Sequence, residues 1–561
     1  MSINLFTEHE KTLQGALDAI QIRSFHSAYP EVPSGKIYGA TAKEDGQAAF
    51  ESYLDSPFFL AQSASEGTVG NEISPYGIKI GTQYPKVNIQ QLIESIEASC
   101  VKWRSVSVEK RVGIAMEILD RLNKRSFEMA LAVMHTTGQG FMMAFQAGGP
   151  HAQDRGLEAI AYAYKAMKDC PAQSTWKKQV GRDEFVTLHK EFKIIPRGVS
   201  LVIGCSTFPT WNTYPGLFAS LVTGNAVVVK PHPGSILPLA ITVQICQDVL
   251  MEQGFSADVV TLVADTADEP MTKELVENNT INIVDYTGGS AFGDWVEANA
   301  GNAIVYTEKA GVNSMIIDSV TSMKSVSGNL AFSLCLYSGQ MCTTPQNIFI
   351  PRAGIDTADG HLSFDEVADA IVKGVDWMLS DQARANEVLG AIQNKATADR
   401  VDSASGKVLR NSDSIEHAMF ADARIRSVKI IQLDAVDEKV FEKEMFGPIV
   451  YIVATDSTKQ SIELASSIAR KHGAISCGVY STCDNVLEQT IDAMTLAGVP
   501  VSCNLLGSIW VNQSAAFSDF HVSGANPSGN ATLADLAFVT GRFNVVQART
   551  LVSERQKAEV E

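Results

Sequence analysis

The chain has 561 residues, which is too long for a single compact core and indicates about two to four structural units. Hydrophobic residues make up 45% and charged residues 19% of the sequence, as in an ordinary folded protein, so extensive disorder is excluded. The net charge of −18 opposes binding to nucleic acid or to an anionic membrane surface, and we expect neither as a partner.

Nine cysteines are spread along the chain, and none of them forms a Cys-x-x-Cys pair. The odd number and the spacing argue against a disulfide framework and against a zinc ribbon, so no metal is expected. The first residues carry no signal sequence, and the chain contains no stretch of about 18 apolar residues. We therefore expect a soluble protein of the reducing cytoplasm.

The first part of the chain is predicted to be mostly helical. Residues 1–80 are expected to contain an opening helix followed by an irregular arm rich in Gly, Pro and Ser. From Asn88 to Lys168, apolar residues recur three and four positions apart, which is the period of an amphipathic helix. Gly138 and the Gly-Gly-Pro run at 148–150 interrupt this pattern and predict breaks between helices.

Strand signals begin after these helices. Residues 175–195 alternate in polarity around a Gly-Arg-Asp turn and predict a β-hairpin. After Pro196, short apolar runs alternate with helical stretches, which is the signature of a parallel α/β sheet. The expected strands of this sheet are 200–204, 226–230, 259–263 and 282–286. A second alternating region runs from 314 to 504, and the tail after Gly529 is too short for another domain.

One cysteine stands in a segment with catalytic features. Cys342 follows a Gly-Gln-Met run within Tyr337–Thr344. A thiolate is a strong nucleophile, but a lone cysteine is more often a small buried apolar residue. The segment by itself leaves both interpretations open.

A carboxylate in an apolar stretch is a candidate general base. Glu308 lies in Tyr306–Gly311, near the end of an expected strand. Most glutamates at such places are on the surface. A buried carboxyl here would instead activate water or the cysteine.

Three further segments have features of a dinucleotide site. The strand 282–286 runs into Gly288-Gly289 before a helix, and such a turn exposes backbone N–H groups that seat a phosphate. An ordinary strand–helix turn is an equally good interpretation. Lys230 ends another strand, where open α/β sheets bind ligands, although a solvated lysine would look the same. Residues 441–448 form a charged helix end that stops at Gly-Pro.

Together and in this order, the five segments resemble those of the aldehyde dehydrogenase superfamily. Glu308 and Cys342 match the acid and nucleophile motifs of that family at its usual spacing. The resemblance covers roughly residues 85–550. The runs at 205–212 and 230–233, with the N-terminal arm, are similar to the PaaN-type branch, aldehyde dehydrogenases associated with phenylacetate breakdown.

The resemblance implies an α/β fold with a Rossmann-type cofactor domain, an α/β catalytic domain and a small β element for oligomerisation. The implied boundaries are an N-terminal extension over 1–84, a cofactor domain over 85–310 that includes the hairpin 175–195, a catalytic domain over 311–505, and a return over 506–561 to the cofactor domain and an oligomerisation strand. Members of the family are dimers or pairs of dimers, so we expect a homodimer or homotetramer.

The resemblance also implies a mechanism. The Cys342 thiolate attacks the aldehyde carbon, hydride passes to the nicotinamide, and Glu308 activates a water that hydrolyses the thioester. Glu444 would hold the nicotinamide ribose, Phe446 would pack near the ring, and Lys230 would bind the adenosine ribose. The expected cofactor-binding residues are Lys230, His232, Pro233, Gly288, Gly289, Glu444 and Phe446.

The oxyanion site departs from the family pattern. Relatives place an asparagine amide there, and counting back from Gly224-Asn225 puts that position on Thr207. A hydroxyl also donates a hydrogen bond but reaches less far. Because the loss of one oxyanion donor costs about 10²–10³ in rate, Thr207 puts efficient turnover in question. Asn212 lies in an expected helix and would reach the site only if the local backbone shifted.

Cofactor choice depends on residue 233. NAD-preferring relatives place a glutamate at this position to bind the ribose 2′-OH, whereas this chain has Pro233. Without that carboxylate a 2′-phosphate is not repelled, and His232 and Lys230 add partners of positive charge. We therefore expect NADP to be accepted and preferred, with NAD as the alternative cofactor.

The residue after the acid also departs from the family. Lys309 stands where relatives usually have an apolar side chain. Neighbouring residues of a strand point to opposite faces, so we expect Lys309 to face away from Glu308. If it faced the acid, its charge would favour the ionised carboxylate.

Aromatic side chains are expected along the path of the substrate. Two follow Thr207, and two lie in the segment that closes over the substrate tunnel in relatives. These four residues are Phe208, Trp211, Phe517 and Phe520. They suit an apolar or aromatic aldehyde, and plain core packing is an equally good interpretation.

The leading hypothesis is NAD(P)-dependent oxidation of an aldehyde, an aromatic or phenylacetate-pathway semialdehyde, to its acid. A CoA-acylating dehydrogenase, which passes the acyl group to a thiol, is the nearest alternative, although such relatives usually lack the carboxylate of Glu308. A second alternative is a family member that binds cofactor or partner with little turnover, and Thr207 is the reason to consider it.

Overall fold

The first half of the protein is built on a five-stranded parallel sheet. The computed structural model describes residues 4–507, 509–510, 517 and 519–552. The strands of this sheet are β5 (Val199–Ile203), β6 (Ala226–Lys230), β7 (Val260–Leu262), β8 (Ile281–Gly288) and β9 (Ile304–Lys309), in the order β7-β6-β5-β8-β9. The four strands expected from the sequence are confirmed. Because the order reverses at β5 and β8, a crevice opens at the carboxyl ends of these two strands.

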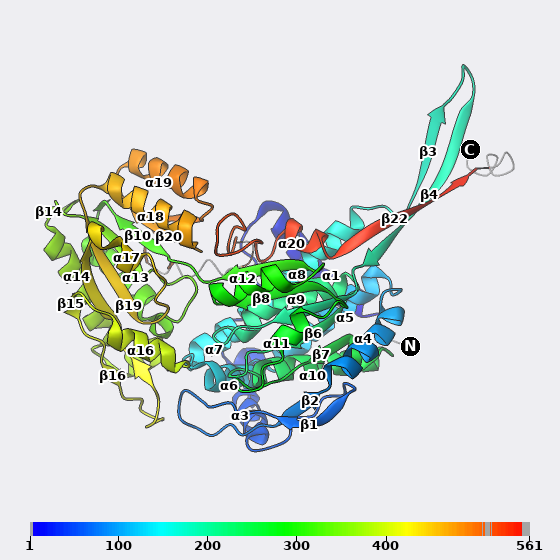
Figure 1. Ribbon diagram of the computed structural model, residues 1–561, viewed down its shortest axis with the longest axis horizontal. Helices are drawn as coiled ribbons and strands as arrows, with labels where there is room; N and C mark the ends of the chain where they lie inside the picture. The colour runs from blue at the N-terminus through cyan, green and yellow to red at the C-terminus, as the bar shows by residue number, and fades with distance from the viewer. Residues whose placement is uncertain (1–3, 508, 511–516, 518, 553–561) are drawn as a thin grey trace.

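Helices cover both faces of this sheet, which explains why its valine and isoleucine runs are buried (Figure 1). They are α4 (Ile89–Trp103), α5 (Val108–Lys124), α6 (Ser126–Thr137), α7 (Phe141–Gly148), α8 (Pro150–Lys168), α9 (Pro209–Val222), α10 (Leu237–Glu252), α11 (Thr272–Val276) and α12 (Ser290–Asn299). The expected breaks are present, since Gly138 ends α6 with a positive φ of 86° and Pro150 begins α8. Among the described residues, no helix is long and apolar enough to cross a membrane.

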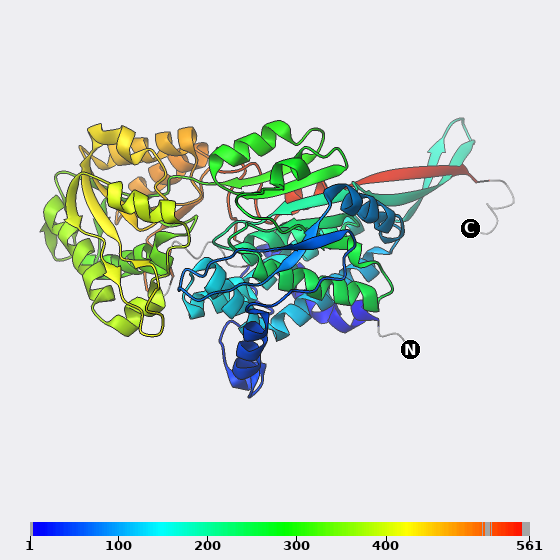
Figure 2. The same ribbon diagram turned by 60° about the horizontal axis from the view of Figure 1, so that its bottom comes forward.

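The N-terminal residues contain more regular structure than expected. The opening helix is confirmed as α1 (Leu5–Ile22), and it packs on α5 and α8. The arm is not irregular throughout, because it also forms α2 (Gly35–Tyr38), α3 (Ala42–Tyr53), β1 (Ser65–Val69) and β2 (Tyr84–Val87). Helix α3 is stabilised by tertiary packing, in which Phe50 is buried and Gly46 lies against Phe127 of α6. In Figure 2 this dark blue segment projects from the rest of the protein.

The second half forms a seven-stranded sheet beside the first (Figure 1). The sheet order is β15-β18-β19-β12-β10-β20-β21, with β10 (Ser314–Ile317), β12 (Asn347–Pro351), β15 (Lys407–Arg410), β18 (Lys429–Asp434), β19 (Ile449–Thr455), β20 (Cys477–Tyr480) and β21 (Val501–Cys503). Its helices are α13 (Met323–Cys335), α14 (Phe364–Leu379), α15 (Gln382–Val388), α16 (Lys395–Ser403), α17 (Glu438–Phe441), α18 (Thr458–His472) and α19 (Asp484–Leu496). Small ladders add β11 (Ser319–Val320), β13 (Ile355–Thr357), β14 (Gly360–Leu362), β16 (Ser414–Ile415) and β17 (Ile425–Arg426). We call the two halves the five-stranded body and the seven-stranded body.

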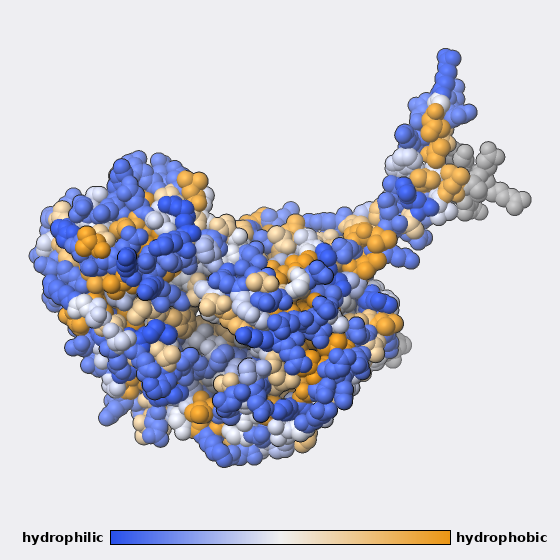
Figure 3. Space-filling model, in the orientation of Figure 1, coloured by the Kyte–Doolittle hydropathy of each residue, from blue (hydrophilic) through white to orange (hydrophobic). Residues whose placement is uncertain are grey.

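A three-stranded antiparallel arm extends from the five-stranded body (Figures 1 and 3). It consists of β3 (Gln173–Gln179), β4 (Phe185–Pro196) and β22 (Phe543–Leu551), with β4 in the centre. Both the predicted hairpin and the predicted C-terminal strand are confirmed. The expected fold class, a Rossmann-type sheet with a second α/β body and a small β element, is also confirmed.

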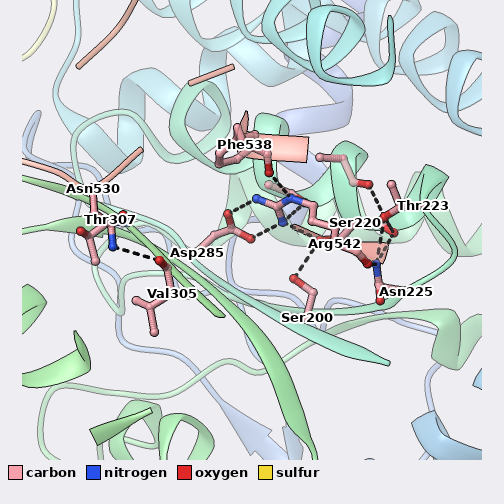
Figure 4. A network of polar contacts seen from close by, with 12 residues as sticks. Ser200, Ser220, Thr223, Asn225, Asp285, Val305, Thr307, Asn530, Phe538 and Arg542 are labelled. Carbon is pink, nitrogen blue, oxygen red and sulfur yellow. Dashed lines mark hydrogen bonds and ion pairs between the residues drawn. The ribbon is translucent and has the colours of Figure 1, made fainter. Parts of the chain in front are cut away.

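A buried ion pair fixes the C-terminal return of the chain onto the five-stranded body (Figure 4). The Arg542 guanidinium follows the short helix α20 (Leu536–Thr540) and donates to both oxygens of Asp285 on β8, at 2.5 and 2.7 Å. It also donates to Ser220 Oγ of α9 at 2.7 Å. Asn530 adds a second anchor, because its amide bonds with the backbone of Val305 and Thr307 on β9. These contacts hold the segment from Asn530 to Arg542 against β8 and β9.

Removal of the arginine should destabilise this return strongly. Arg542→Met leaves the Asp285 carboxylate buried without its partner, and breaking a buried pair in this way costs about 3–5 kcal/mol. We expect a fall in the free energy of unfolding of that size by denaturant titration. The free energy of unfolding should fall less in the double variant Arg542→Met/Asp285→Asn than in the single variant, because no unpaired charge remains buried. Equal losses in the two variants would contradict this account.

Candidate active site

A cleft of about 540 Å³ lies between the two bodies, at the carboxyl ends of β5, β8 and β9. The hollow between the two halves is visible in the surface view (Figure 3). Most of the residues singled out from the sequence line this cleft: Thr207, Phe208, Lys230, His232, Pro233, Gly288, Gly289, Glu308, Cys342, Glu444 and Phe446. The structure therefore brings together side chains that come from both bodies and are far apart in sequence.

Cys342 lies on the seven-stranded side of the cleft, in the loop before β12. The turn that leads into it places Tyr337 and Ser338 at positive φ, which is uncommon for residues with a side chain. The Asn313 amide donates to the backbone carbonyl of Cys342 at 2.6 Å and fixes the loop. Burial and the neighbouring Glu308 carboxylate raise the pKa of the Cys342 thiol well above its usual value. The resting side chain is therefore a neutral thiol, and its proton must leave when it reacts.

Glu308 ends β9 on the opposite side of the cleft and is buried, with 3% of its surface exposed. The surface position usual for a glutamate is therefore excluded here. The Asn212 amide Nδ2 lies 2.8 Å from Glu308 Oε2, and His521 Nε2 lies 2.8 Å from Oε1. A carboxylate held by two donors and placed beside a thiol is suited to act as a base in acyl chemistry.

His521 lies beside Cys342 and Glu308, and the sequence did not single it out. Its Nε2 lies 3.8 Å from Cys342 Sγ, and its ring is 2% exposed. It belongs to a loop without helical or strand periodicity, so no local pattern marks it. Only the C-terminal return over β9 brings it to the cleft. One donor atom each of Cys342, Glu308 and His521 lie within 4.8 Å of one another.

The structure changes the assessment of the oxyanion site. Helix α9 begins at Pro209 and presents Asn212 from its first turn to the cleft, where its amide bonds with Glu308, and a role of Asn212 at the oxyanion stays a prediction. Thr207 also lines the cleft, from the loop before α9. Its backbone carbonyl accepts a bond from Gln139 Nε2 at 2.8 Å, while its hydroxyl lies 4.0 Å from Cys205 Sγ. Both candidate donors therefore stand in the site.

The glycine turn after β8 opens into the cleft. Tyr286 Oη donates to the Gly289 carbonyl at 2.9 Å and holds the turn in place. A Cβ added at Gly289 would meet no atom within 4 Å, so the space in front of this backbone is open to a ligand. Gly289 is also the N-cap of α12, whose first N–H groups suit a phosphate.

Lys230 and His232, the two residues expected to offer positive charge to a 2′-phosphate, both have little charge to offer. Lys230 Nζ is buried and bonds with Asp265 Oδ1 at 2.7 Å, so its charge is already balanced. Desolvation, with the Lys230 charge, lowers the pKa of His232 to about 4, and its Nδ1 accepts a bond from the Gly234 N–H. His232 is therefore neutral at physiological pH. Pro233 lines the cleft without a polar group.

Glu444 and Phe446 line the cleft from the loop before β19. Arg400 braces this loop by donating to the carbonyls of Met445 and Phe446, each at 2.9 Å. Burial raises the pKa of Glu444 to about 7, and the Arg400 charge offsets part of that shift. A half-buried carboxyl facing a cavity in this way is able to accept hydrogen bonds from ribose hydroxyls.

The cleft carries groups that suit a dinucleotide. The open backbone at Gly289 lines it together with Lys230 and Glu444. The reacting thiol of Cys342 lines the same cavity. Polar groups for a phosphate and for ribose hydroxyls are thus present in one cavity with the thiol.

The four aromatic residues expected on the substrate path do not share one surface. Phe208 lines the cleft and packs edge-on against Tyr337. Trp211 is buried against His521, and Phe517 is buried against His26. Phe520 is 47% exposed, with Arg23 over its ring. A substrate role for Phe208, Trp211, Phe517 and Phe520 stays a prediction.

Lys309 faces away from Glu308, as strand alternation predicts. Its Nζ bonds with Asp294 at 2.8 Å and with Glu297 at 3.2 Å, both on α12. Its charge is therefore used to attach α12 to β9 and does not act on the acid.

Comparisons with known proteins agree with this geometry. The model of the aldehyde dehydrogenase family matches residues 65–533. A crystal structure of an NAD-dependent aldehyde dehydrogenase from Burkholderia multivorans superposes with a TM-score of 0.97 at 52% sequence identity, covering 99% of this chain and 100% of that one.

Two curated relatives are more distant. A dimeric NADP-preferring aldehyde dehydrogenase of Canis lupus familiaris is 24% identical over 349 residues, which is 61% of this chain and 70% of the relative. An N-succinylglutamate 5-semialdehyde dehydrogenase of Paraburkholderia xenovorans is 24% identical over 385 residues, which is 68% of this chain and 74% of the relative.

Proposed function

The chain belongs to the aldehyde dehydrogenase family, and we propose that it oxidises an aldehyde to a carboxylic acid through a thioester at Cys342. It is an oxidoreductase that acts on aldehydes with NAD or NADP. The observation that carries the proposal is the placement of the Cys342 thiol beside the buried Glu308 carboxylate in one cleft. We propose that the cofactor is bound by Lys230, His232, Pro233, Gly288, Gly289, Glu444 and Phe446.

The acylation half-reaction begins at the thiol. As the Cys342 proton passes to the Glu308 carboxylate, sulfur attacks the aldehyde carbon and the carbonyl electrons move to oxygen. The Asn212 amide reaches the cleft beside Glu308 and stabilises the negative oxygen with the backbone N–H of Cys342. The bound dinucleotide supplies the hydride acceptor. Loss of hydride from the former aldehyde carbon leaves a thioester on Cys342.

The second half-reaction is hydrolysis. Glu308 first releases the proton of Cys342 to solvent, and it then takes a proton from a water, whose oxygen attacks the thioester carbon. The carbon–sulfur bond then breaks, the electron pair returns to Cys342 sulfur, and the carboxylic acid leaves. The net change is aldehyde, water and oxidised cofactor to acid, reduced cofactor and a proton. A CoA-acylating enzyme would instead pass the acyl group to a second thiol, and the buried Glu308 beside Cys342 supports hydrolysis.

The finer features of the proposal have separate support. An aromatic or phenylacetate-pathway semialdehyde is favoured as substrate by Phe208 in the cleft wall. The exposed apolar residues of the arm support assembly into a homodimer or homotetramer through it: Trp176, Val180, Phe185, Val545, Val546 and Leu551. The cysteines are unpaired, which supports the cytoplasm as the compartment.

We propose four divisions of the chain. An N-terminal extension covers 1–84, the cofactor domain 85–310, and the catalytic domain with the Cys342 thiol 311–505. The return to the cofactor domain covers 506–561, of which residues 508, 511–516, 518 and 553–561 lie outside the described residues.

Removal of the thiol tests the proposed function directly. With a panel of aromatic and aliphatic aldehydes, the wild type should release reduced cofactor steadily, whereas Cys342→Ala should lose about 10⁴-fold or more in kcat/KM. Cys483→Ala, an exposed cysteine far from the cleft, is the matched control and should keep wild-type rates. Free acid should form without added CoA. Turnover by Cys342→Ala, or product only when CoA is present, would overturn the proposal.

The two candidate oxyanion donors are separable by substitution. Asn212→Ala should lower kcat by about 10²–10³, since it removes a donor to the transition-state oxygen. Thr207→Val keeps the side-chain shape and should cost less than about threefold, because the remaining amide still donates. Rates are compared at saturating aldehyde and cofactor. A larger fall in kcat for Thr207→Val than for Asn212→Ala would contradict this assignment and indicate Thr207 as the oxyanion donor.

Cofactor preference should respond to Asp265. Pro233 removes a carboxylate that would repel a 2′-phosphate, but the buried Asp265 holds the Lys230 charge. Asp265→Asn should free that charge and raise the ratio of kcat/KM for NADP over NAD by about tenfold, which corresponds to about 1.4 kcal/mol. The neighbouring exposed Asp268→Asn is the control. An unchanged ratio in Asp265→Asn would show that this pair lies outside cofactor selection.

A further inference from the structure

His521 is placed at the cleft by two backbone anchors. Its loop pairs with the chain further on, since the Leu533 N–H donates to the His521 carbonyl at 3.2 Å. Asn530, within the same loop, bonds with the backbone of Val305 and Thr307, which lie on the strand of Glu308. The loop of the histidine and the strand of the acid are therefore held together by contacts that involve neither side chain.

The His521 ring carries its proton on Nε2. Its Nδ1 is buried and has no hydrogen-bond partner among the residues that the structure describes. A buried N–H without an acceptor is costly, so the proton is not placed there. Nε2 is therefore the donor, and Glu308 Oε1 accepts at 2.8 Å. The same orphan Nδ1 argues against metal coordination, because a histidine ligand normally donates its other ring N–H to a neighbour.

Two donors then share the Glu308 carboxylate. His521 Nε2 bonds with Oε1, and Asn212 Nδ2 bonds with Oε2 at 2.8 Å. With one donor at each oxygen, rotation of the carboxylate about its terminal bond breaks both hydrogen bonds. Each oxygen keeps a further lone pair that is able to accept a proton from water. The pair of donors fixes the direction of Glu308 and leaves it able to act as a base.

The histidine ring is itself supported by α9. Trp211 packs edge-on against it, with ring centres 4.6 Å apart, and Trp211 is the residue next to Asn212. The Arg155 guanidinium lies over the Trp211 ring, 5.2 Å from the ring centre. One turn of α9 thus positions both donors, Asn212 directly and His521 through Trp211.

We propose that His521 is a positioning residue that aims Glu308 at the water of thioester hydrolysis. The proposal rests on the proposed function of Cys342 and Glu308. Attack by water needs the base, the water and the thioester carbon aligned at the same moment, whereas the thiol proton reaches a carboxylate that already lies beside it. Loss of the His521 bond should therefore slow deacylation more than acylation.

The experiment separates these two half-reactions. In His521→Ala, steady-state kcat should fall by about 10²-fold, the usual size of a general-base contribution. The single-turnover rate of NAD(P)H formation should fall less than about threefold, so a burst of one NAD(P)H per site should precede slow turnover. The KM for aldehyde should change little. A defect of folding alone would lower the amplitude of both phases together.

Two further variants complete the test. His521→Gln keeps an amide donor and should recover most of kcat, which also covers the case in which the alanine variant folds poorly. His361→Ala removes an exposed histidine that pairs with Asp356 in the seven-stranded body, and it should behave as the wild type. A kcat for His521→Ala within twofold of wild type, or equal losses in both half-reactions, would overturn the proposal. Turnover by Cys342→Ala would instead overturn the proposed function.

Discussion

The burial of the Glu308 carboxylate is the constraint on which the site depends. A charged carboxylate that is 3% exposed is tolerated only when donors replace the water it has lost. Asn212 of α9 and His521 of the C-terminal return supply these donors. The acid is therefore held by three parts of the chain that are distant in sequence, and each of them has to be in place before Cys342 has a base beside it.

The C-terminal return is built to meet this constraint. The buried contact of Arg542 with Asp285 attaches the return to β8, and Asn530 attaches it to β9. Because both strands end at the cleft, the loop between these anchors is carried over the carboxyl end of the sheet. The stability of the return and the geometry of the acid are therefore parts of one arrangement, in which a buried ion pair positions the loop that carries His521.

Local patterns predicted the parts of the protein that depend on neighbouring residues. The parallel strands and the hairpin of the arm follow from short periodic runs, whereas the pairing of Glu308 with Cys342 came only from the resemblance of the ordered segments to a known family. His521 had no such signal, since its place depends on a return of the chain over β9. The direction of the Asn212 side chain depends on the start of α9 at Pro209, which turns it toward Glu308 and which the helical pattern alone does not locate. Asp265 was missed because its contact with Lys230 joins the ends of two strands.

The central claim is that the acyl group is carried by Cys342 and released by Glu308. The most direct measurement is acid quenching of His521→Ala during turnover with an aldehyde and cofactor, followed by peptide mass mapping. We predict that an acyl group accumulates on the peptide that contains Cys342, at close to one per chain, because Glu308 still takes the thiol proton while hydrolysis is slowed. An acyl group on Cys205, which lines the same cleft, or no acyl group at all, would contradict the account.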